Sequence, residues 1–326
     1  MDPRHLVDDL LEITIAGSFT RPGLALRRRL FDWQAPAPDV LRGRTVLVTG
    51  PTSGLGRVAT GGLAALGARV VLVGRSRERL ERVRDELVAL HGDDRFPIVV
   101  GDLASLASVR AAADRILATE ARLDGLIDNA GAMFRTRAAS PDGIEATLAT
   151  LVVGPFALLG RLMPLLRTTA GHVISVTSGG MYLQPVHLDD LEWAAEPYSG
   201  ARAYARAKRI QIALVREWAR RLAGSGVRVN AMHPGWADTP GLADALPAFH
   251  DLMRPLLRTP EQGADTILWL AADRDAASEN GRLFLDRRRR PFDRFPGTRL
   301  GPADRRRLWD EIVRLSGEPD PVALPA

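Results

Sequence analysis

The chain has 326 residues, of which 46% are hydrophobic and 25% charged, and this composition indicates a folded globular protein. It contains no cysteine, which excludes disulfides, thiolate metal sites and a cysteine nucleophile. Its 44 Lys and Arg residues against 39 Asp and Glu give a net charge of +5, so nucleic acid is not expected as a partner. The six histidines lack the spacing of metal ligands, and no metal site is expected.

Residues 1–43 differ in composition from the rest and are interpreted as an appendage with a linker at Pro36-Ala37-Pro38. Within it, residues 24–33 alternate basic and apolar side chains. We favour a short helix packed on the main domain over peripheral contact with a membrane. The N-terminus lacks the layout of a secretory signal, and no window reaches the roughly 20 uninterrupted apolar residues of a membrane span. We therefore expect a cytoplasmic protein.

From residue 44 onward, short apolar runs alternate with helical stretches. Such runs are typical of strands buried on both faces, and intervals of about 20 residues leave room for crossover helices. Seven strands are predicted, at 45–48, 69–73, 97–100, 123–127, 172–176, 227–230 and 282–285. The sequence therefore predicts an α/β fold with a doubly wound parallel sheet, a Rossmann fold, over residues 44–290. A C-terminal extension follows at 291–326, and the run of arginines at 287–290 is interpreted as a solvated loop rather than an anionic partner site.

The turn after the first predicted strand has the pattern of a dinucleotide site. It reads Thr49-Gly50-Pro51-Thr52-Ser53-Gly54-Leu55-Gly56 and leads into an Ala- and Leu-rich helix that runs to Gly67. The three glycines permit positive φ and close approach to a phosphate, and the helix N-terminus offers free N–H groups and partial positive charge. A purely structural glycine turn is the alternative, but the order of strand, turn and helix favours a dinucleotide.

The second predicted strand ends at Gly74-Arg75-Ser76, where a protein selective for NAD(H) is expected to carry an acidic residue. Arg75, helped by the Ser76 hydroxyl, can bind an adenosine 2′-phosphate with charge-assisted hydrogen bonds. Alternatively, Arg75 opens a solvated helix rich in paired charges. We favour the phosphate role, and so predict NADP(H) over NAD(H).

Further motifs follow the later strands in order, and together they resemble the short-chain dehydrogenase/reductase (SDR) family over residues 44 to about 290. They are Asp102-Leu103, Asp128-Asn129-Ala130-Gly131, Thr177-Ser178, Tyr204-Ala205-Arg206-Ala207-Lys208 and His233-Pro234-Gly235-Trp236-Ala237-Asp238-Thr239. Residues 178–181, 232–241 and 262–266 resemble the group of dehydrogenase/reductase SDR family member twelve more closely.

The resemblance implies a role for each motif. Asp102 and Leu103 border the adenine, and Asn129, Ala130 and Gly131 lie beside the cofactor. Tyr204 exchanges a proton with the substrate oxygen, to which Ser178 donates a hydrogen bond. Lys208 holds the nicotinamide ribose, and Thr239, after the Pro234-Gly235 turn, contacts the carboxamide, whereas His233 is expected to be structural.

Tyr204 and Lys208 are four residues apart, so on a helix they share one face. A nearby ammonium favours the phenolate, and we expect Lys208 to bring the pKa of Tyr204 down from its ordinary value near 10. Taken singly, each of these residues also has a structural interpretation. Residues 181–203, with Trp193 and Tyr198, are expected to loop out and form one wall of the pocket.

One position departs from the family pattern. Family members usually carry an Asn where this chain has Leu151, and there it stabilises a helix distortion and a water linked to the catalytic Lys. The three asparagines of the chain, Asn129, Asn230 and Asn280, cannot fill this role by register. We expect Leu151→Asn to raise turnover with a general carbonyl substrate; no gain would mean that another route supplies the proton.

Residues 240–258 carry apolar side chains at helical spacing, which suits either a lid over a lipophilic substrate or a face buried against the core or a second subunit. The favoured function is an NADP(H)-dependent oxidoreductase acting on a small carbonyl or alcohol. The alternative is a cofactor-binding scaffold with little catalysis, since Leu151 replaces the family Asn.

Overall fold

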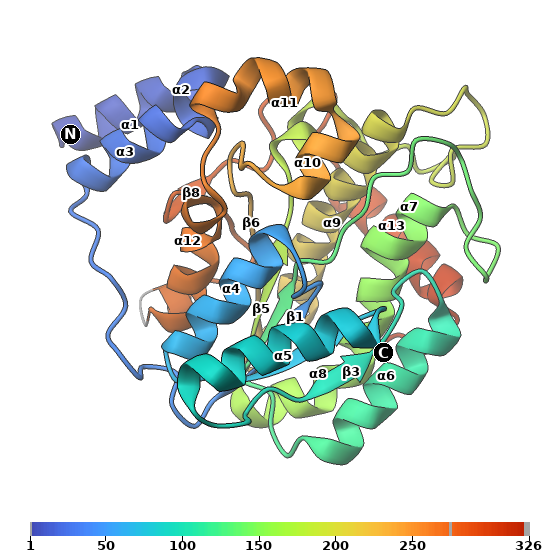
Figure 1. The fold of residues 1–326 in the computed structure, drawn as a ribbon. Helices are drawn as coiled ribbons and strands as arrows, with labels where there is room; N and C mark the ends of the chain where they lie inside the picture. The colour runs from blue at the N-terminus through green and yellow to red at the C-terminus, as the bar shows by residue number, and fades with distance from the viewer. Residues whose placement is uncertain (1, 274–275, 323–326) are drawn as a thin grey trace.

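A computed structural model describes residues 2–273 and 276–322. Eight strands form one sheet in the order β3-β2-β1-β4-β5-β6-β7-β8, parallel except for the antiparallel pair β7 and β8 (Figure 1). The strands are β1 Thr45–Thr49, β2 Arg69–Gly74, β3 Ile98–Val100, β4 Gly125–Asp128, β5 His172–Val176, β6 Arg228–Met232, β7 Leu283–Leu285 and β8 Arg288–Arg290. The predicted doubly wound parallel sheet is confirmed, and its order reverses between β1 and β4, where such folds bind ligands.

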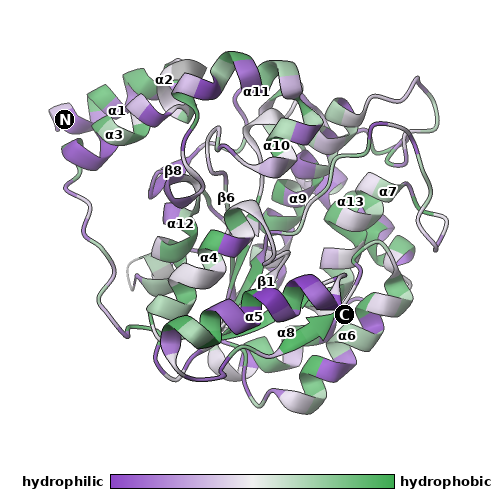
Figure 2. Ribbon diagram, viewed as in Figure 1, coloured by the Kyte–Doolittle hydropathy of each residue, from purple (hydrophilic) through white to green (hydrophobic). Residues whose placement is uncertain are grey.

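Helices cover both faces of the sheet. The longer ones are α4 Gly54–Ala65, α5 Arg77–His91, α6 Leu106–Thr119, α8 Gly154–Thr169, α9 Gly200–Arg221, α12 Pro260–Ala272 and α13 Pro302–Ser316. The shorter ones are α1 Pro3–Ile13, α2 Ile15–Phe19, α3 Arg21–Leu30, α7 Ala146–Leu148, α10 Pro240–Ala245, α11 Pro247–Met253, η1 Ala149–Val153, η2 Gly179–Leu183, η3 Arg254–Leu256 and η4 Ala276–Ser278. Apolar side chains of α4, α5 and α12 fill one face, and those of α6, α8, α9 and α13 the other. Figure 2 shows hydrophobic residues, in green, along α4, α6 and α8.

All seven predicted strands are present, but β8 was not predicted. The two-residue turn that joins β7 to β8 holds Asp286 and Arg287 at φ 56° each. The arginine run of 287–290 is therefore not a solvated loop, because three of its residues form an edge strand and Arg290 is buried. The strand was not predicted because a run of like charges is typical of a solvated loop. The carboxylates that pair with its arginines come from elsewhere in the fold.

Those carboxylates belong largely to the N-terminal appendage, where α1, α2 and α3 pack together on the β7–β8 edge (Figure 1). Arg27 is fully buried and pairs with Asp8 and Asp286 at 2.7 Å each. Asp286 also binds Arg258 at 2.6 Å, and Asp8 binds Arg290 at 2.9 Å. The appendage is thus fixed to the domain by a buried ion network that draws on four parts of the chain.

The segment expected either to pack or to contact a membrane lies mostly in α3, which buries Leu24 and Arg27. On the same helix Leu26 is 38% exposed, and Arg28 and Arg29 face solvent. Residues 146–169 are long and apolar enough to cross a membrane by length and composition. However, 67% of their most apolar window is buried, as suits a core helix.

Candidate active site

A cavity of about 1140 Å³ opens at the carboxyl ends of the parallel strands. The residues predicted to bind the cofactor all line it: Thr49, Gly50, Ser53, Gly54, Leu55, Gly56, Arg75, Ser76, Asp102, Leu103, Asn129, Ala130, Gly131, Pro234, Gly235 and Thr239. Ser178, Tyr204 and Lys208 line it as well. The strand order thus brings motifs that are spread over 190 residues (239 − 49) to one site.

The glycine turn packs too closely for side chains. Gly50 has φ +66°, and a Cβ on Gly56 would lie 2.1 Å from the carbonyl oxygen of Gly50. The first turn of α4 follows directly, with Ser53 at its N-cap making no side-chain cap bond. Its free N–H groups therefore face the cavity as a site for a phosphate.

Asn129, in the motif that follows β4, is hydrogen-bonded to this glycine turn. Its amide donates to the Thr49 and Gly50 carbonyls at 3.0 and 3.3 Å. The Thr49 hydroxyl accepts from the backbone N–H groups of Asn129 and Ala130 at 3.0 Å each. These bonds fix the floor of the cavity between β1 and β4.

Arg75 is exposed at the rim of the cavity and makes no ion pair with another described residue. Ser76 is the N-cap of α5 and accepts from the Arg79 N–H at 3.4 Å. Arg79 lines the cavity too, although the sequence analysis considered only Arg75. The Asp102 carboxylate caps its own turn by accepting from the Ala104 N–H at 3.0 Å.

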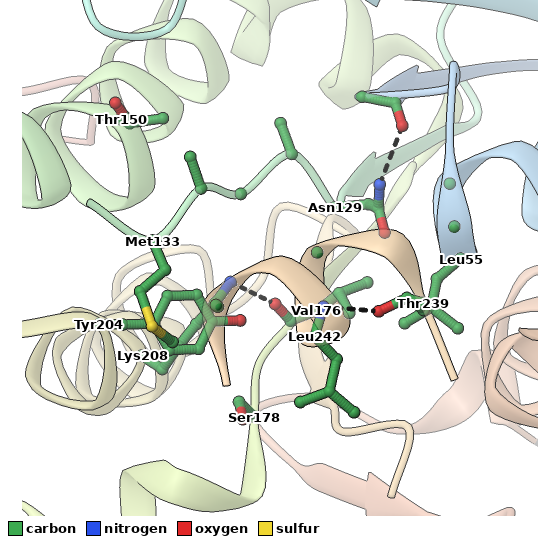
Figure 3. A pocket seen from close by; sticks show the side chains of 18 of the residues that line it. Leu55, Asn129, Met133, Thr150, Val176, Ser178, Tyr204, Lys208, Thr239 and Leu242 are labelled. Carbon is green, nitrogen blue, oxygen red and sulfur yellow. Dashed lines mark hydrogen bonds between the residues drawn. The ribbon is translucent and has the colours of Figure 1, made fainter. Parts of the chain in front are cut away.

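Ser178, Tyr204 and Lys208 gather at the other end of the cavity (Figure 3). α9 presents Tyr204 and Lys208 on one face, as their spacing of four residues predicts. The Lys208 ammonium lies 5.6 Å from the Tyr204 ring centroid and donates to the Val176 carbonyl at 2.8 Å. Ser178 follows β5 directly and lies near the phenol in the same view.

The electrostatics of this trio differ from the expectation. Burial raises the pKa of Tyr204 to about 12 and lowers the pKa of Lys208 to about 8. The expected lowering of the tyrosine pKa by Lys208 is absent here, because the ammonium is turned to the Val176 carbonyl. The Asp128 carboxylate opposes this effect of burial on the pKa of Lys208, because it favours the charged form of the amine.

Lys208 is also the only lysine in the chain, whose other 43 basic residues (44 − 1) are arginines. An amine of adjustable pKa differs chemically from an arginine, which stays charged. This imbalance could have singled out Lys208 from the sequence before any motif was considered.

The helix distortion associated with the family Asn is retained without it. η1 is a π-helix, and the Gly154 N–H donates to the Ala149 carbonyl across it. The Leu151 side chain is fully buried in the core, while its carbonyl accepts from the Gln211 side chain at 2.8 Å. The three asparagines bind elsewhere, as expected: Asn129 at the glycine turn, Asn230 to His172, and Asn280 to the Val229 N–H.

The appendage contributes a wall of the cavity that was not predicted from the sequence. Phe19, at the end of α2, lines the cavity and packs edge-to-face against His233. A Cβ on Gly179 would lie 2.6 Å from the Phe19 ring, so this glycine makes room for it. His233 is fully buried, in keeping with a structural role, and burial lowers its pKa to about 3.

The remaining walls match the expectations in part. Leu242, Leu246 and Phe249 line the cavity, but Leu252 is 77% exposed, and 240–258 forms three short helices rather than one. In the inserted segment Tyr182 and Leu183 line the cavity. Trp193 and Tyr198 do not, because they pack on each other and the Tyr198 hydroxyl binds Thr147 and Glu145.

A nicotinamide dinucleotide fits this arrangement. The contact that a Cβ on Gly56 would make shows that the turn admits backbone alone, which is what close approach to a pyrophosphate requires. Arg75, after β2, and the Tyr204 group, beside β5, border the same cavity, and the sheet order places β1 and β4 between them.

Comparison with known proteins gives the same assignment. The family model of short chain dehydrogenases matches residues 44–248. Human dehydrogenase/reductase SDR family member 12 is 37% identical over 76% of this chain and 77% of its own, and mouse retinol dehydrogenase 14 is 35% identical over 84% and 86%. The Pseudomonas aeruginosa RhlG/NADP complex superposes with a TM-score of 0.62 at 27% identity, covering 76% of this chain and 96% of that one. The chain therefore belongs to the short-chain dehydrogenase/reductase family, whose members are oxidoreductases that use a nicotinamide cofactor.

Proposed function

We propose that this protein is an NADP(H)-dependent oxidoreductase that interconverts a carbonyl and an alcohol on a lipophilic small molecule. The observation that carries the proposal is the convergence of Ser178, Tyr204 and Lys208 at one end of a cavity whose other end has a glycine turn and a free arginine. A bound nicotinamide would supply or accept the hydride. The protein's own side chains would handle the proton and the orientation of the substrate.

Tyr204 is the proton donor for carbonyl reduction. Its O–H bond breaks as the substrate oxygen gains the proton, and Ser178 donates a second hydrogen bond to the same oxygen. A pKa of about 12 makes the neutral phenol the resting form, which is the form a proton donor needs. For the reverse direction, the Lys208 ammonium would have to leave the Val176 carbonyl and turn toward the phenolate and the ribose hydroxyls.

The preference for NADP(H) rests on Arg75, with Arg79 as a second cation at the same rim. Among related structures, RhlG of P. aeruginosa is an NADP complex, and an Escherichia coli short chain dehydrogenase with 27% identity is an NADPH complex. A 2′-phosphate would receive charge-assisted bonds there, whereas the hydroxyl of NAD would leave the guanidinium without an anion.

The lipophilic substrate class rests on the walls around Tyr204. Apolar side chains from four separate segments line the cavity: Phe19, Met133, Leu183, Trp236, Leu242, Leu246 and Phe249. A pocket with so many apolar side chains in its walls suits a hydrophobic ketone, aldehyde or alcohol. Mouse retinol dehydrogenase 14, a relative named for a lipophilic alcohol, is consistent with this class.

A catalytically weak cofactor-binding scaffold is the second candidate. Leu151 favours it, because the family Asn that helps to relay protons to the lysine is missing. The raised pKa of Tyr204 favours it too, since the phenolate needed for alcohol oxidation is scarce at neutral pH.

The deciding experiment has two stages. NADPH and NADH are titrated by calorimetry, and a panel of aliphatic and aromatic carbonyls is then tested for NADPH oxidation with Tyr204→Phe as the control. We expect tight NADPH binding and oxidation that Tyr204→Phe abolishes. Binding without Tyr204-dependent oxidation would select the scaffold, and no binding of either dinucleotide would reject both candidates.

A further inference from the structure

Behind the lysine, on the side away from the active-site cavity, lies a second group of polar side chains. Asp128 ends β4, Ser175 faces it from β5, and Gln211 lies one turn beyond Lys208 on α9. All three line an internal cavity of about 40 Å³ that also borders Leu151. The group therefore lies next to Leu151, the position at which most members of the family carry a polar Asn.

The hydrogen bonds of the group are only partly complete. One carboxylate oxygen of Asp128, Oδ2, accepts from the Ser175 hydroxyl at 3.0 Å and from the Gln211 amide at 3.3 Å. The same amide donates to the Leu151 carbonyl at 2.8 Å. Asp128 Oδ1 and Gln211 Oε1 are buried and have no hydrogen-bond partner among the described residues.

Both unpartnered atoms are acceptors, and a water molecule has two donor hydrogens. A cavity of about 40 Å³ exceeds the roughly 10–15 Å³ that one water needs. Leaving two buried acceptors unbonded is unfavourable, because each has given up its hydrogen bonds to bulk water. A single water bridging Asp128 and Gln211 would remove that cost.

The second observation concerns charge. Burial raises the pKa of Asp128, while the Lys208 ammonium and the Ser175 hydroxyl oppose that shift and favour the carboxylate; Asp128 in turn favours the charged form of Lys208. The side chains that line this cavity around Asp128 carry no charge: they are Thr49 of β1, Ser175 of β5, Leu151 of η1 and Gln211 of α9. Among the described residues, Tyr204 is the other titratable side chain beside Lys208.

We propose that Asp128 and Gln211 are positioning residues that take over the task of the missing family Asn. Gln211 binds the Leu151 carbonyl, which lacks a helical partner four residues on because Pro155 has no N–H. Asp128 is the counter-charge that keeps Lys208 protonated, and a water bridges the two. The inference concerns the proton side of the proposed reaction and so rests on the proposed function, but its central test does not require turnover.

That test uses the fact that Lys208 is the only lysine. Labelling lysine with ¹³C at Cε gives one side-chain signal, whose pH titration reports the protonation of Lys208 directly. Asp128→Asn keeps the shape of the side chain and removes its charge. We expect the Lys208 titration to move by about one pH unit toward lower pH.

Asp124→Asn is the matched control. Asp124 is buried just before β4 and binds Arg122 and the Thr45 N–H, at the opposite end of the strand from Lys208. This variant should lose stability but leave the Lys208 titration unchanged. An unchanged titration in Asp128→Asn, or an equal shift in both variants, would overturn the counter-charge.

Kinetics test the role of Gln211. Gln211→Leu should lower kcat about tenfold with little change in KM. Adding Leu151→Asn to it should restore most of the loss, a larger gain in kcat than Leu151→Asn gives in the wild type. A purely structural loss would not be rescued by an Asn at 151. Equal kcat in Gln211→Leu and wild type, or a loss that Leu151→Asn leaves in place, would overturn the role of Gln211.

If wild type and Tyr204→Phe oxidise NADPH equally, the proposed function is rejected, but this inference is not rejected with it. The lysine titration and a high-resolution crystal structure still decide the inference. A water within hydrogen-bond distance of both Asp128 Oδ1 and Gln211 Oε1 would support it, and a cavity without ordered density would reject the bridge.

Discussion

Phe19 and His233 pack edge-to-face with their ring centroids 4.6 Å apart, and this contact joins the N-terminal appendage to the active site. The Phe19 carbonyl also accepts from the Trp236 N–H at 2.8 Å, so backbone and ring are both fixed. A segment that the sequence sets apart as an appendage therefore supplies part of the cavity wall. Substrate recognition and the docking of residues 1–43 are expected to depend on each other.

The first prediction concerns this wall. Phe19→Leu should raise KM for a bulky apolar carbonyl about threefold to tenfold, because a smaller side chain leaves the substrate less apolar contact. KM for NADPH should not change, since Phe19 lies at the end of the cavity away from Arg75. Steady-state kinetics measure both constants. Phe96→Leu, a buried substitution that does not line the cavity, should leave both KM values unchanged, and a similar rise there would contradict the role of Phe19.

The buried ion network should make stability fall in acid. Burial pushes the pKa of Asp8 up, but hydrogen bonds and charge from Arg290 and Arg27 outweigh it and lower the pKa to about 2. A depressed carboxylate pKa stabilises the fold above the unfolded value near 4, and that stability is lost as the pH falls toward 2. The shift corresponds to about 2 kcal/mol at neutral pH.

Asp8→Asn isolates this contribution. Urea unfolding at pH 6 and at pH 3 should show a free-energy difference from wild type that is large at pH 6 and smaller at pH 3. A difference that stays constant with pH would mean that packing, and not ionisation, accounts for the loss.

The strands were predictable because β-branched runs such as 45–48 are buried on both faces, and burial depends on local sequence. β8 was not, because Arg288 and Arg290 are neutralised by Asp8, a residue of the appendage far away in sequence. Arg27 and Asp286 are likewise 259 positions apart. Packing of the appendage helix on the main domain was expected from the sequence, but nothing local indicates such pairs, and so the place where the appendage docks could not be inferred.

The site shows the same division. Tyr204, Lys208 and the glycine turn have fixed spacings that a sequence displays directly. The bond from Gln211 to the Leu151 carbonyl spans 60 positions and depends on how α9 crosses η1. Sequence therefore indicated that the usual Asn was missing, whereas the replacement became visible only in the folded chain.

Gly56 should tolerate no side chain. In Gly56→Ala the new Cβ would meet the Gly50 carbonyl oxygen at 2.1 Å, so the turn must open and the phosphate site with it. We expect the Kd for NADPH, measured by fluorescence titration, to rise by at least about tenfold, or about 1.4 kcal/mol.

Gly61→Ala on the same helix is the matched control, because nothing lies within 4 Å of its Cβ. Alanine is the better helix former by about 1 kcal/mol, so this variant should be slightly more stable and bind NADPH normally. Equal Kd values for Gly56→Ala and wild type would show that the turn does not hold the cofactor.

Arg75→Asp should move cofactor preference toward NAD. The substitution removes the cation proposed to bind the 2′-phosphate and adds a carboxylate that would repel a phosphate but can accept from the ribose hydroxyls of NAD. The ratio of the NADPH and NADH dissociation constants should change by at least about tenfold, which corresponds to the loss of one charge-assisted bond of about 1.5–3 kcal/mol.

Arg82→Asp is the matched control, because Arg82 is at a solvated position on α5 and does not line the cavity. It tests whether the change in net charge alone alters the cofactor preference. If the two variants change the ratio equally, long-range charge explains the preference; if neither changes it, Arg75 does not select the phosphate, and Arg79 becomes the residue to test.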